Sequence, residues 1–226
     1  MHPHIGGLFD PALLARSLDG GYVREQTHPT LPLRILNYTE KAQFEREWNE
    51  VTRQCRGLIT DRQGRILTRP YARFFNYSEH PEGTFSLDEK VVVTDKLDGS
   101  LGILYPLPDD GYAIATRGSF ASGQAVHATK SWQERYADTA QIKPGVTYLF
   151  EIIFPENRIV CDYGTLDDLV SAASMLPPAP RCPLTNCRGK APVSPSTSPR
   201  SPRLWQRVRV PAPRASCCAS PAVTTP

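Results

Sequence analysis

Lys96 lies in the segment TDKLDGS of residues 94–100, whose residue types suit covalent chemistry at phosphorus. A lysine amine attacks phosphorus only after losing its proton, and its ordinary pKa is about 10.4, so a reactive lysine needs a buried or cation-rich setting. A β-branched run precedes Lys96 and Asp98-Gly99 follows it, which predicts a lysine at a strand end beside a tight turn that the glycine permits. The alternative is a surface hairpin turn with an incidental lysine.

Glu151 is a lone carboxylate in the otherwise apolar run YLFEIIF of residues 148–154. A buried carboxylate costs several kcal/mol unless it is paired or hydrogen-bonded. Its position therefore indicates a role in a site. The alternative is an outward-facing residue on an edge strand.

Three arginines stand in settings that suit phosphate recognition. Arg56 and Arg117 each precede a glycine, and Arg73 lies in the run RPYARFFN of residues 69–76. A guanidinium presents a planar fork of donors to phosphate oxygens. The alternative for Arg56 is a surface arginine next to a glycine turn, and for Arg117 a solvated turn residue. Phe74 and Phe75 could equally be core residues, and the following asparagine is a weak site candidate.

Periodicity predicts the first elements of the fold. Residues 33–37 form an apolar strand, and Thr39 is a helix N-cap. Phe44, Trp48 and Val51 recur at helical spacing, so one helix is expected to run to about residue 53 with that face buried.

The remaining pattern is rich in neighbouring antiparallel strands. A glycine-containing turn joins strands 57–60 and 65–68, and a second pair is expected at 101–105 and 112–116. A helix is expected over 121–137, a third hairpin over 146–154 and 158–163, and a helix over 166–175 that ends before Pro177. The pattern predicts an α+β fold.

Composition divides the chain near residues 169–176. The last acidic residue is Asp168, and prolines, arginines and serines dominate from 177 onward. We therefore expect an N-terminal segment over 1–30, a folded domain over 31–175 and a basic, disordered tail over 176–226. The cysteines at 182, 187, 217 and 218 lack the two separated pairs typical of zinc sites.

No apolar run reaches the length of a membrane span, about 18 residues or more. The N-terminus shows no basic region followed by an apolar stretch, so no signal peptide is evident and a cytoplasmic location is expected. No protein partner is inferred from the sequence.

Five segments in order resemble the phage-type RNA ligase family of covalent nucleotidyltransferases. They are CRGLI at 55–59, RPYARFFN at 69–76, KLDGS at 96–100, TRGS at 116–119 and YLFEII at 148–153. The resemblance covers roughly residues 30–170. It implies an antiparallel-sheet-rich nucleotidyltransferase domain of the ATP-grasp-like ligase adenylation type.

The resemblance implies a role for each residue. Lys96 would attack the α-phosphate of ATP and hold AMP, which then passes to an RNA 5′-phosphate before a 3′-hydroxyl seals the strand, as in RNA repair. Arg56, Arg73, Asp98, Gly99, Arg117 and Glu151 would bind the nucleotide. Arg73 stands where the family commonly has lysine. Mg²⁺ is expected as cofactor, with Glu151 as its candidate ligand.

Two later motifs of the family are missing from residues 164–226. One is a Glu-Gly-x-Val-like strand and the other a strand with paired lysines; no glutamate follows Glu156, and the only lysine after residue 143 is Lys190. The domain is therefore expected to be incomplete and its activity impaired. A reading-frame shift near codons 170–176 would explain the change of composition. A basic tail that binds RNA is the competing explanation.

Three functions stay open at this point. The first is an ATP-dependent RNA ligase, or at least a self-adenylylating protein. The second is a non-catalytic remnant that binds nucleotide or RNA. The third is a capping-type guanylyltransferase, which would use GTP.

Overall fold

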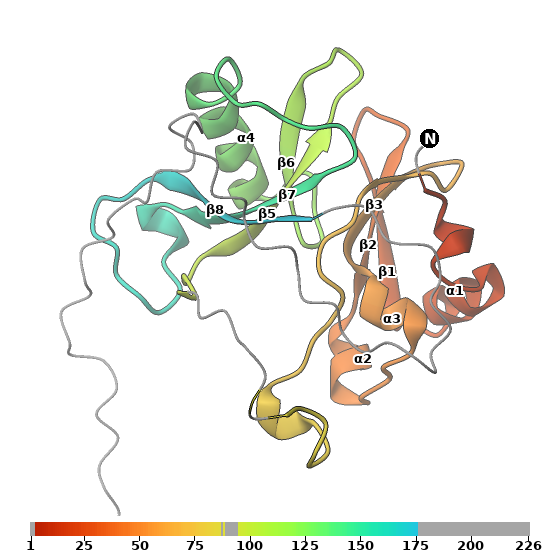
Figure 1. Ribbon diagram of the computed structural model, residues 1–226. Coiled ribbons are helices and arrows are strands. Elements are labelled where there is room, and N and C mark those ends of the chain that lie inside the picture. The colour runs from red at the N-terminus through yellow and green to blue at the C-terminus, as the bar shows by residue number, and fades with distance from the viewer. Residues whose placement is uncertain (1–2, 87, 89–94, 176–226) are drawn as a thin grey trace, which may run out of the picture.

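A computed structural model describes residues 3–86, 88 and 95–175 of the chain (Figure 1). Two four-stranded antiparallel sheets form the body, with strand orders β1-β2-β3-β4 and β6-β5-β7-β8. The first sheet comprises β1 (Val23–Thr27), β2 (Leu33–Tyr38), β3 (Arg56–Asp61) and β4 (Ile66–Thr68). The second comprises β5 (Ser100–Pro106), β6 (Tyr112–Thr116), β7 (Thr147–Ile153) and β8 (Asp168–Met175). The predicted α+β class is confirmed.

Short helices connect and cover the strands. The α-helices are α1 (Pro11–Asp19), α2 (Glu40–Phe44), α3 (Glu50–Gln54) and α4 (Gly123–Arg135). Three 3₁₀ turns, η1 (Ile5–Gly7), η2 (Tyr77–Glu79) and η3 (Pro155–Asn157), complete the described elements. Residues of the segment 1–30 supply α1 and β1, and β1 pairs with β2. None of the helices in the described part of the chain has both the length and the apolar character of a membrane span.

Strand alternation divides the core into three layers. Leu36 and Leu58 pack with the residues of α1 and α3 on one face of the first sheet. Their neighbours Ile35 and Ile59 pack on the other face, in one cluster with Ile103 and Leu149 of the second sheet. Side chains of successive strand residues point to opposite faces, so the two sheets pack against each other.

Helix α4 covers the outer face of the second sheet (Figure 1). Trp132 and Ala128 pack there with Leu104, Ile114 and Phe150. The Ser122 side chain caps the helix by accepting the Ala125 N–H. The helix predicted over 121–137 is confirmed, with these apolar residues facing the sheet.

The single helix expected to run from residue 39 to 53 is wrong. Thr39 does cap α2, but Arg46 adopts a φ of 56° and the chain leaves the helix. Asn49 then starts α3 with a capping box that involves Thr52. Local side-chain hydrogen bonds outweigh the helical spacing here. Phe44 is therefore 90% exposed, whereas Val51 is buried as predicted.

Two predictions near the end of the described region are also wrong. Residues 168–175 form strand β8 rather than a helix, because they pair along the whole of β7. This pairing overrides the local helical signal. Residues 158–163 form a loop after η3 rather than a strand, and some of their backbone N–H groups bond to Asp98 instead of to a sheet. The other predicted strands outside 91–94 are confirmed.

Some predictions fall outside the described residues. They are the strand expected at 91–94, which leads into Lys96, and the disordered tail over 176–226.

Candidate functional site

Lys96 is exposed and lies just before the start of β5. The three residues after it are half-buried, so the segment passes from solvent into the second sheet within a short distance. The Lys96 charge acts on the carboxylates of Asp98 and Glu151, where it favours their ionised forms. The amine therefore lies in an exposed position near two carboxylates, and the strand expected to lead into it, 91–94, is outside the described residues.

Asp98 is held by the loop that follows η3. Its Oδ2 accepts the backbone N–H groups of Val160 at 2.7 Å and Cys161 at 2.8 Å. Its own N–H donates to the Tyr163 hydroxyl at 2.8 Å. The two backbone donors, that of Cys161 first, lower the pKa of the Asp98 carboxyl below its ordinary value. The carboxylate thus fixes the chain after Lys96 and is not a free base.

Glu151 lies on β7, an interior strand of its sheet, so the edge-strand alternative is wrong. Its Oε1 accepts the Gly99 N–H at 2.8 Å. It shares the strand face of Leu149, which packs toward the first sheet. Burial raises the pKa of the Glu151 carboxyl, and the Gly99 N–H, Lys96 and Arg56 oppose that rise.

Gly99 is required by space rather than by an unusual backbone angle. A Cβ at this position would meet the Ile152 carbonyl oxygen at 2.5 Å and Glu151 Cγ at 3.2 Å. Gly99 is not among the glycines with positive φ in the described chain. The unusual backbone geometry expected for this glycine is therefore wrong, and nucleotide binding by Gly99 stays a prediction.

Arg56 begins β3 and lies half-buried at the same end of the sheets. Burial is the main cause that lowers the pKa of its guanidinium, while the Tyr38 hydroxyl accepts a hydrogen bond from it and opposes that shift. Arg117 donates from Nη1 to the same hydroxyl at 3.3 Å, and its guanidinium lies 5.2 Å from the Tyr38 ring centre. Tyr38 therefore joins the two arginines, a contact that the sequence alone did not show.

Arg73 lies against two aromatic rings that contact each other. Its guanidinium carbon lies 4.9 Å from the Phe75 ring centre and 5.3 Å from that of Trp48. Its charge also acts on Arg56, which places the two guanidiniums in one region. Phe74 is 61% exposed and is not a core residue, whereas Phe75 is half-buried. Asn76 is exposed and precedes η2.

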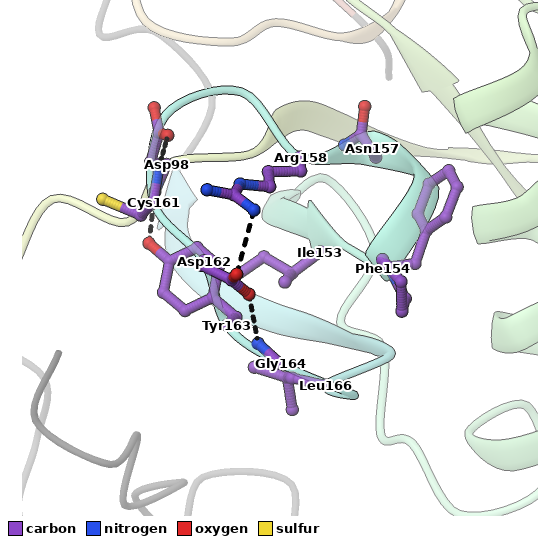
Figure 2. Close-up of a pocket in the computed structure, with 11 residues that line it drawn as sticks. Asp98, Ile153, Phe154, Asn157, Arg158, Cys161, Asp162, Tyr163, Gly164 and Leu166 are labelled. Atoms are coloured by element: carbon purple, nitrogen blue, oxygen red, sulfur yellow. Dashed lines mark hydrogen bonds and ion pairs between the residues drawn. The ribbon is translucent and has the colours of Figure 1, made fainter. Parts of the chain in front are cut away.

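A cavity of about 230 Å³ is lined by Asp98, by η3 and by the loop that follows η3 (Figure 2). Arg158 and Asp162, which both line the cavity, form an ion pair at 2.9 Å. Asn157 bonds to Ser100 Oγ at 3.1 Å and ties η3 to the start of β5. The sequence did not identify Tyr163 or Asn157, because it predicted a strand at 158–163 and a hairpin turn at 155–157.

The residues named from sequence therefore converge at one end of the two sheets. Hydrogen bonds connect Asp98, Gly99 and Glu151 through β5, β7 and the 158–163 loop. Arg56 and Arg117 approach from β3 and from the residue after β6. A three-residue cage of His, Cys, Asp or Glu for a metal ion is not present in the described part of the chain.

Comparison with known proteins gives the class. The sequence matches the RNA ligase family over residues 54–174. A protein of Thermovibrio ammonificans, provisionally named an RNA ligase, is 31% identical over 50% of this chain and 31% of its own length. An RNA ligase of Rhodothermus phage RM378 is 29% identical over 48% of this chain and 34% of its own length.

The family match spans more than half of the chain, and the chain belongs to the RNA ligase family. The resemblance to phage-type RNA ligases is thereby confirmed. The chain spans about a third of the length of the curated relatives it matches.

Proposed function

We propose that the described residues form the adenylation site of an ATP-dependent RNA ligase on a nucleotidyltransferase fold. The observation that supports this most is the position of Lys96. It lies just before the start of β5, and its charge acts on the Glu151 carboxylate, which accepts the Gly99 N–H. A nucleophilic amine, fixed acceptors and a group of guanidiniums are the parts that nucleotidyl transfer requires.

The first step makes one bond and breaks one. The Lys96 amine, after losing a proton, attacks the α-phosphorus of ATP with its lone pair. The nitrogen–phosphorus bond forms, the bond from that phosphorus to the oxygen bridging to the β-phosphate breaks, and pyrophosphate leaves with the electron pair. AMP is left on Lys96 as a phosphoramidate.

The arginines would stabilise the charge of the phosphates. Arg56, Arg73 and Arg117 carry three positive charges in one region, and their mutual repulsion is relieved when an anion binds. Glu151 would accept a hydrogen bond from a ribose hydroxyl with the oxygen that does not bond to Gly99.

Mg²⁺ fits this site only as an ion held chiefly by phosphates and water. Mg²⁺ is commonly bound through one or two carboxylates together with substrate phosphates. Glu151 is the carboxylate that would hold it, as the alternative to the ribose contact, since Oδ2 of Asp98 already accepts two backbone N–H groups. When bound, the ion would neutralise the charge that develops during transfer.

Transfer of AMP to an RNA 5′-phosphate and sealing by a 3′-hydroxyl complete the proposed function. The alternative is a remnant that binds nucleotide or RNA without catalysis. It is favoured by one observation: neither the Glu-Gly-x-Val-like motif nor the paired lysines occur in residues 164–226. The reading-frame shift stays a hypothesis. Sequencing the locus tests it, and the lack of both motifs in every alternative frame would refute it.

Incubation with α-labelled ATP and Mg²⁺ tests the proposal. We expect a covalent label on the protein that survives denaturing electrophoresis and is competed by unlabelled ATP better than by GTP. Label from GTP alone would instead support the capping-type reaction. A folded sample that takes no label from either nucleotide would leave the remnant as the function.

Glu151→Gln is expected to raise stability and lower activity. Burial raises the pKa of Glu151, so the folded state binds a proton there more readily than the unfolded state. The stability from this group is full in acid and is lost as pH rises through the folded-state pKa. Glutamine removes the charge and keeps an oxygen for the Gly99 N–H. We expect the melting temperature of the variant to exceed that of wild type at pH 7.

The difference in melting temperature should shrink as pH falls below the pKa of an unfolded glutamate, about 4.3. The Glu151→Gln variant should also form the covalent label more slowly than wild type, because a charge that costs stability is retained for function. A variant that melts below wild type at pH 7 would contradict the assigned burial. The comparison uses thermal unfolding at several pH values.

Tyr163→Phe tests the loop that holds the lysine segment. The variant leaves the Asp98 N–H without the hydroxyl that accepts it at 2.8 Å. A hydrogen bond contributes about 1 kcal/mol, which corresponds to roughly fivefold in rate. We expect the labelling rate at saturating ATP to fall by that factor, with little change in the ATP concentration that gives half the maximal rate. Tyr71→Phe, at an exposed ring, is the control; equal rates in both variants would remove the positioning role.

A further inference from the structure

The segment from Phe74 to Phe85 exposes large aromatic side chains. It follows β4, contains η2 and projects from the body of the two sheets (yellow in Figure 1). Phe74 is 61% exposed, Tyr77 68% and Phe85 44%. Several large apolar rings left in water by one short segment indicate a surface that binds something.

Arginines lie among these rings. The Arg56 guanidinium lies 5.3 Å from the Phe74 ring centre, and that of Arg53 lies 5.7 Å from the Phe75 ring centre. Arg73 stacks on the same Phe75 ring at 4.9 Å. A guanidinium stacked on a ring can present its edge N–H donors to phosphate oxygens. This applies most directly to the exposed Arg53, because Arg73 donates from Nη1 to the Phe74 carbonyl and has a buried Nε, and Arg56 bonds to the Tyr38 hydroxyl.

These arginines have no carboxylate partner within the described residues. Ion pairs closer than 4 Å there involve Arg34, Arg65, Arg135 and Arg158, but not Arg53, Arg56 or Arg73. Within the described residues the charges of Arg53 and Arg73 are thus not neutralised by an ion pair, and the Arg56 charge acts on Glu151 without forming one. An anionic ligand would supply the missing charge.

Phe75, Tyr77 and Phe85 contact other aromatic rings. Phe75 contacts Trp48 and His80 edge to face, with ring centres 5.8 and 6.1 Å apart. Phe85 in turn contacts His80 at 4.8 Å and Tyr77 at 5.9 Å. A prearranged set of rings loses little side-chain entropy when a base stacks on it.

This surface is continuous with the candidate adenylation site. Arg56 contacts Phe74 on one side, and its charge acts on the Glu151 carboxylate on the other. Glu151 bonds to Gly99, three residues from Lys96. A strand bound along the rings would therefore have one end at the lysine.

We propose that the arginine–aromatic surface, formed by Arg53, Arg56, Arg73, Phe74, Tyr77 and Phe85, binds the unpaired nucleotides of single-stranded RNA next to the end that reacts. The inference rests on the proposed function for the identity of that end. Stacking of bases on aromatic rings beside a row of cations is how proteins bind single strands without reading sequence. The basic region 176–226 has the cations but few aromatics, so it fits this chemistry less well.

Fluorescence anisotropy with the full chain and a labelled single-stranded RNA of about twelve nucleotides tests the inference. The assay contains no ATP, so it reports on the surface independently of label formation. We expect Tyr77→Ala and Phe74→Ala each to weaken binding about tenfold, the usual size of one base–ring stack. Val126→Ala, at an exposed apolar residue on α4 in the other part of the molecule, is the control and should bind as wild type does.

Salt titration separates stacking from charge. Phe74→Ala should shift the affinity at every salt concentration without changing the slope, whereas Arg53→Gln should reduce the slope by about one. Fully paired RNA should bind the wild-type chain more weakly, because its bases are already stacked. Melting curves show whether each variant is folded. If an aromatic variant does not fold, the comparison of Arg53→Gln with wild type tests the surface in its place.

Three results would overturn the inference. Variants that bind RNA as wild type does would show that another region, such as the basic tail, carries the affinity. Equal affinity for paired and unpaired RNA would show that only phosphates are recognised. A wild-type chain that does not bind the single strand would mean that another part of the protein covers these rings. If RNA binds while ATP leaves no label, the surface stands and the proposed ligase function fails.

Discussion

Lys96→Ala is expected to abolish the covalent AMP label completely. The variant removes the amine that attacks the α-phosphorus, and alanine offers no replacement nucleophile. Because Lys96 is exposed and its side chain supports no core cluster, the fold should be retained. We expect label at least 10³-fold below wild type, the order of loss seen when a nucleophile is removed. The measurement is autoradiography of denatured protein after incubation with α-labelled ATP.

Two controls make the result specific. Lys96→Arg keeps a positive charge but places a guanidinium that stays protonated at neutral pH, so it should also take no label. Lys130→Ala removes an exposed lysine on α4, which pairs with Glu134 at 3.8 Å, and should label as wild type does. A nitrogen–phosphorus bond is released by acid and survives alkali, unlike an acyl phosphate on a carboxylate. Undiminished label in Lys96→Ala would place the nucleophile at another residue.

Local patterns predicted the strands well where sequence neighbours are also partners. The β3–β4 and β5–β6 pairs are antiparallel neighbours, and turn residues such as Gly64, with a φ of 79°, lie at the predicted place. Such pairs carry their own signal, because alternation and turn chemistry both lie in one short stretch. The helix α4 was also predicted correctly, since its apolar residues face one side over three turns.

Long-range contacts account for the errors. The local sequence of residues 168–175 resembles that of a helix, but in the structure these residues pair with β7. The loop 158–163 resembles a strand, yet Val160 and Cys161 donate to Asp98, about sixty residues earlier in the chain. A pattern within a short stretch of sequence cannot predict a hydrogen-bond partner so far away in the chain. The order of five motifs identified the family, but it could not reveal Tyr163 or Tyr38 as residues that join the site.

Gly99 was singled out in the sequence for a reason that the structure does not support. The Asp98-Gly99 pair suggested a tight turn that needs the freedom of glycine. In the structure the requirement comes from β7, which passes so close that no Cβ fits between the strands. Sequence patterns report backbone angles through turn residues, whereas the distance to a strand fifty residues away becomes visible only in the folded chain.

Gly99→Ala is therefore expected to damage both stability and labelling. The added Cβ would lie 2.5 Å from the Ile152 carbonyl oxygen, and that oxygen belongs to an interior strand that is paired on both sides. Overpacking of this kind costs about 1–3 kcal/mol. In a domain of this size that corresponds to a fall in melting temperature of roughly 2–4 °C for each kcal/mol.

Displacement of Gly99 from β7 would also break its N–H bond to Glu151 and move Lys96 away from that carboxylate. Labelling by ATP should then fall by more than the small loss of folded protein explains. Gly123→Ala is the matched control, since a Cβ there meets nothing within 4 Å and alanine favours a helix. Thermal unfolding and label formation are measured on both variants. If Gly99→Ala melts and labels as Gly123→Ala does, β7 does not constrain the lysine segment, and the geometry that supports Lys96 as the nucleophile is wrong.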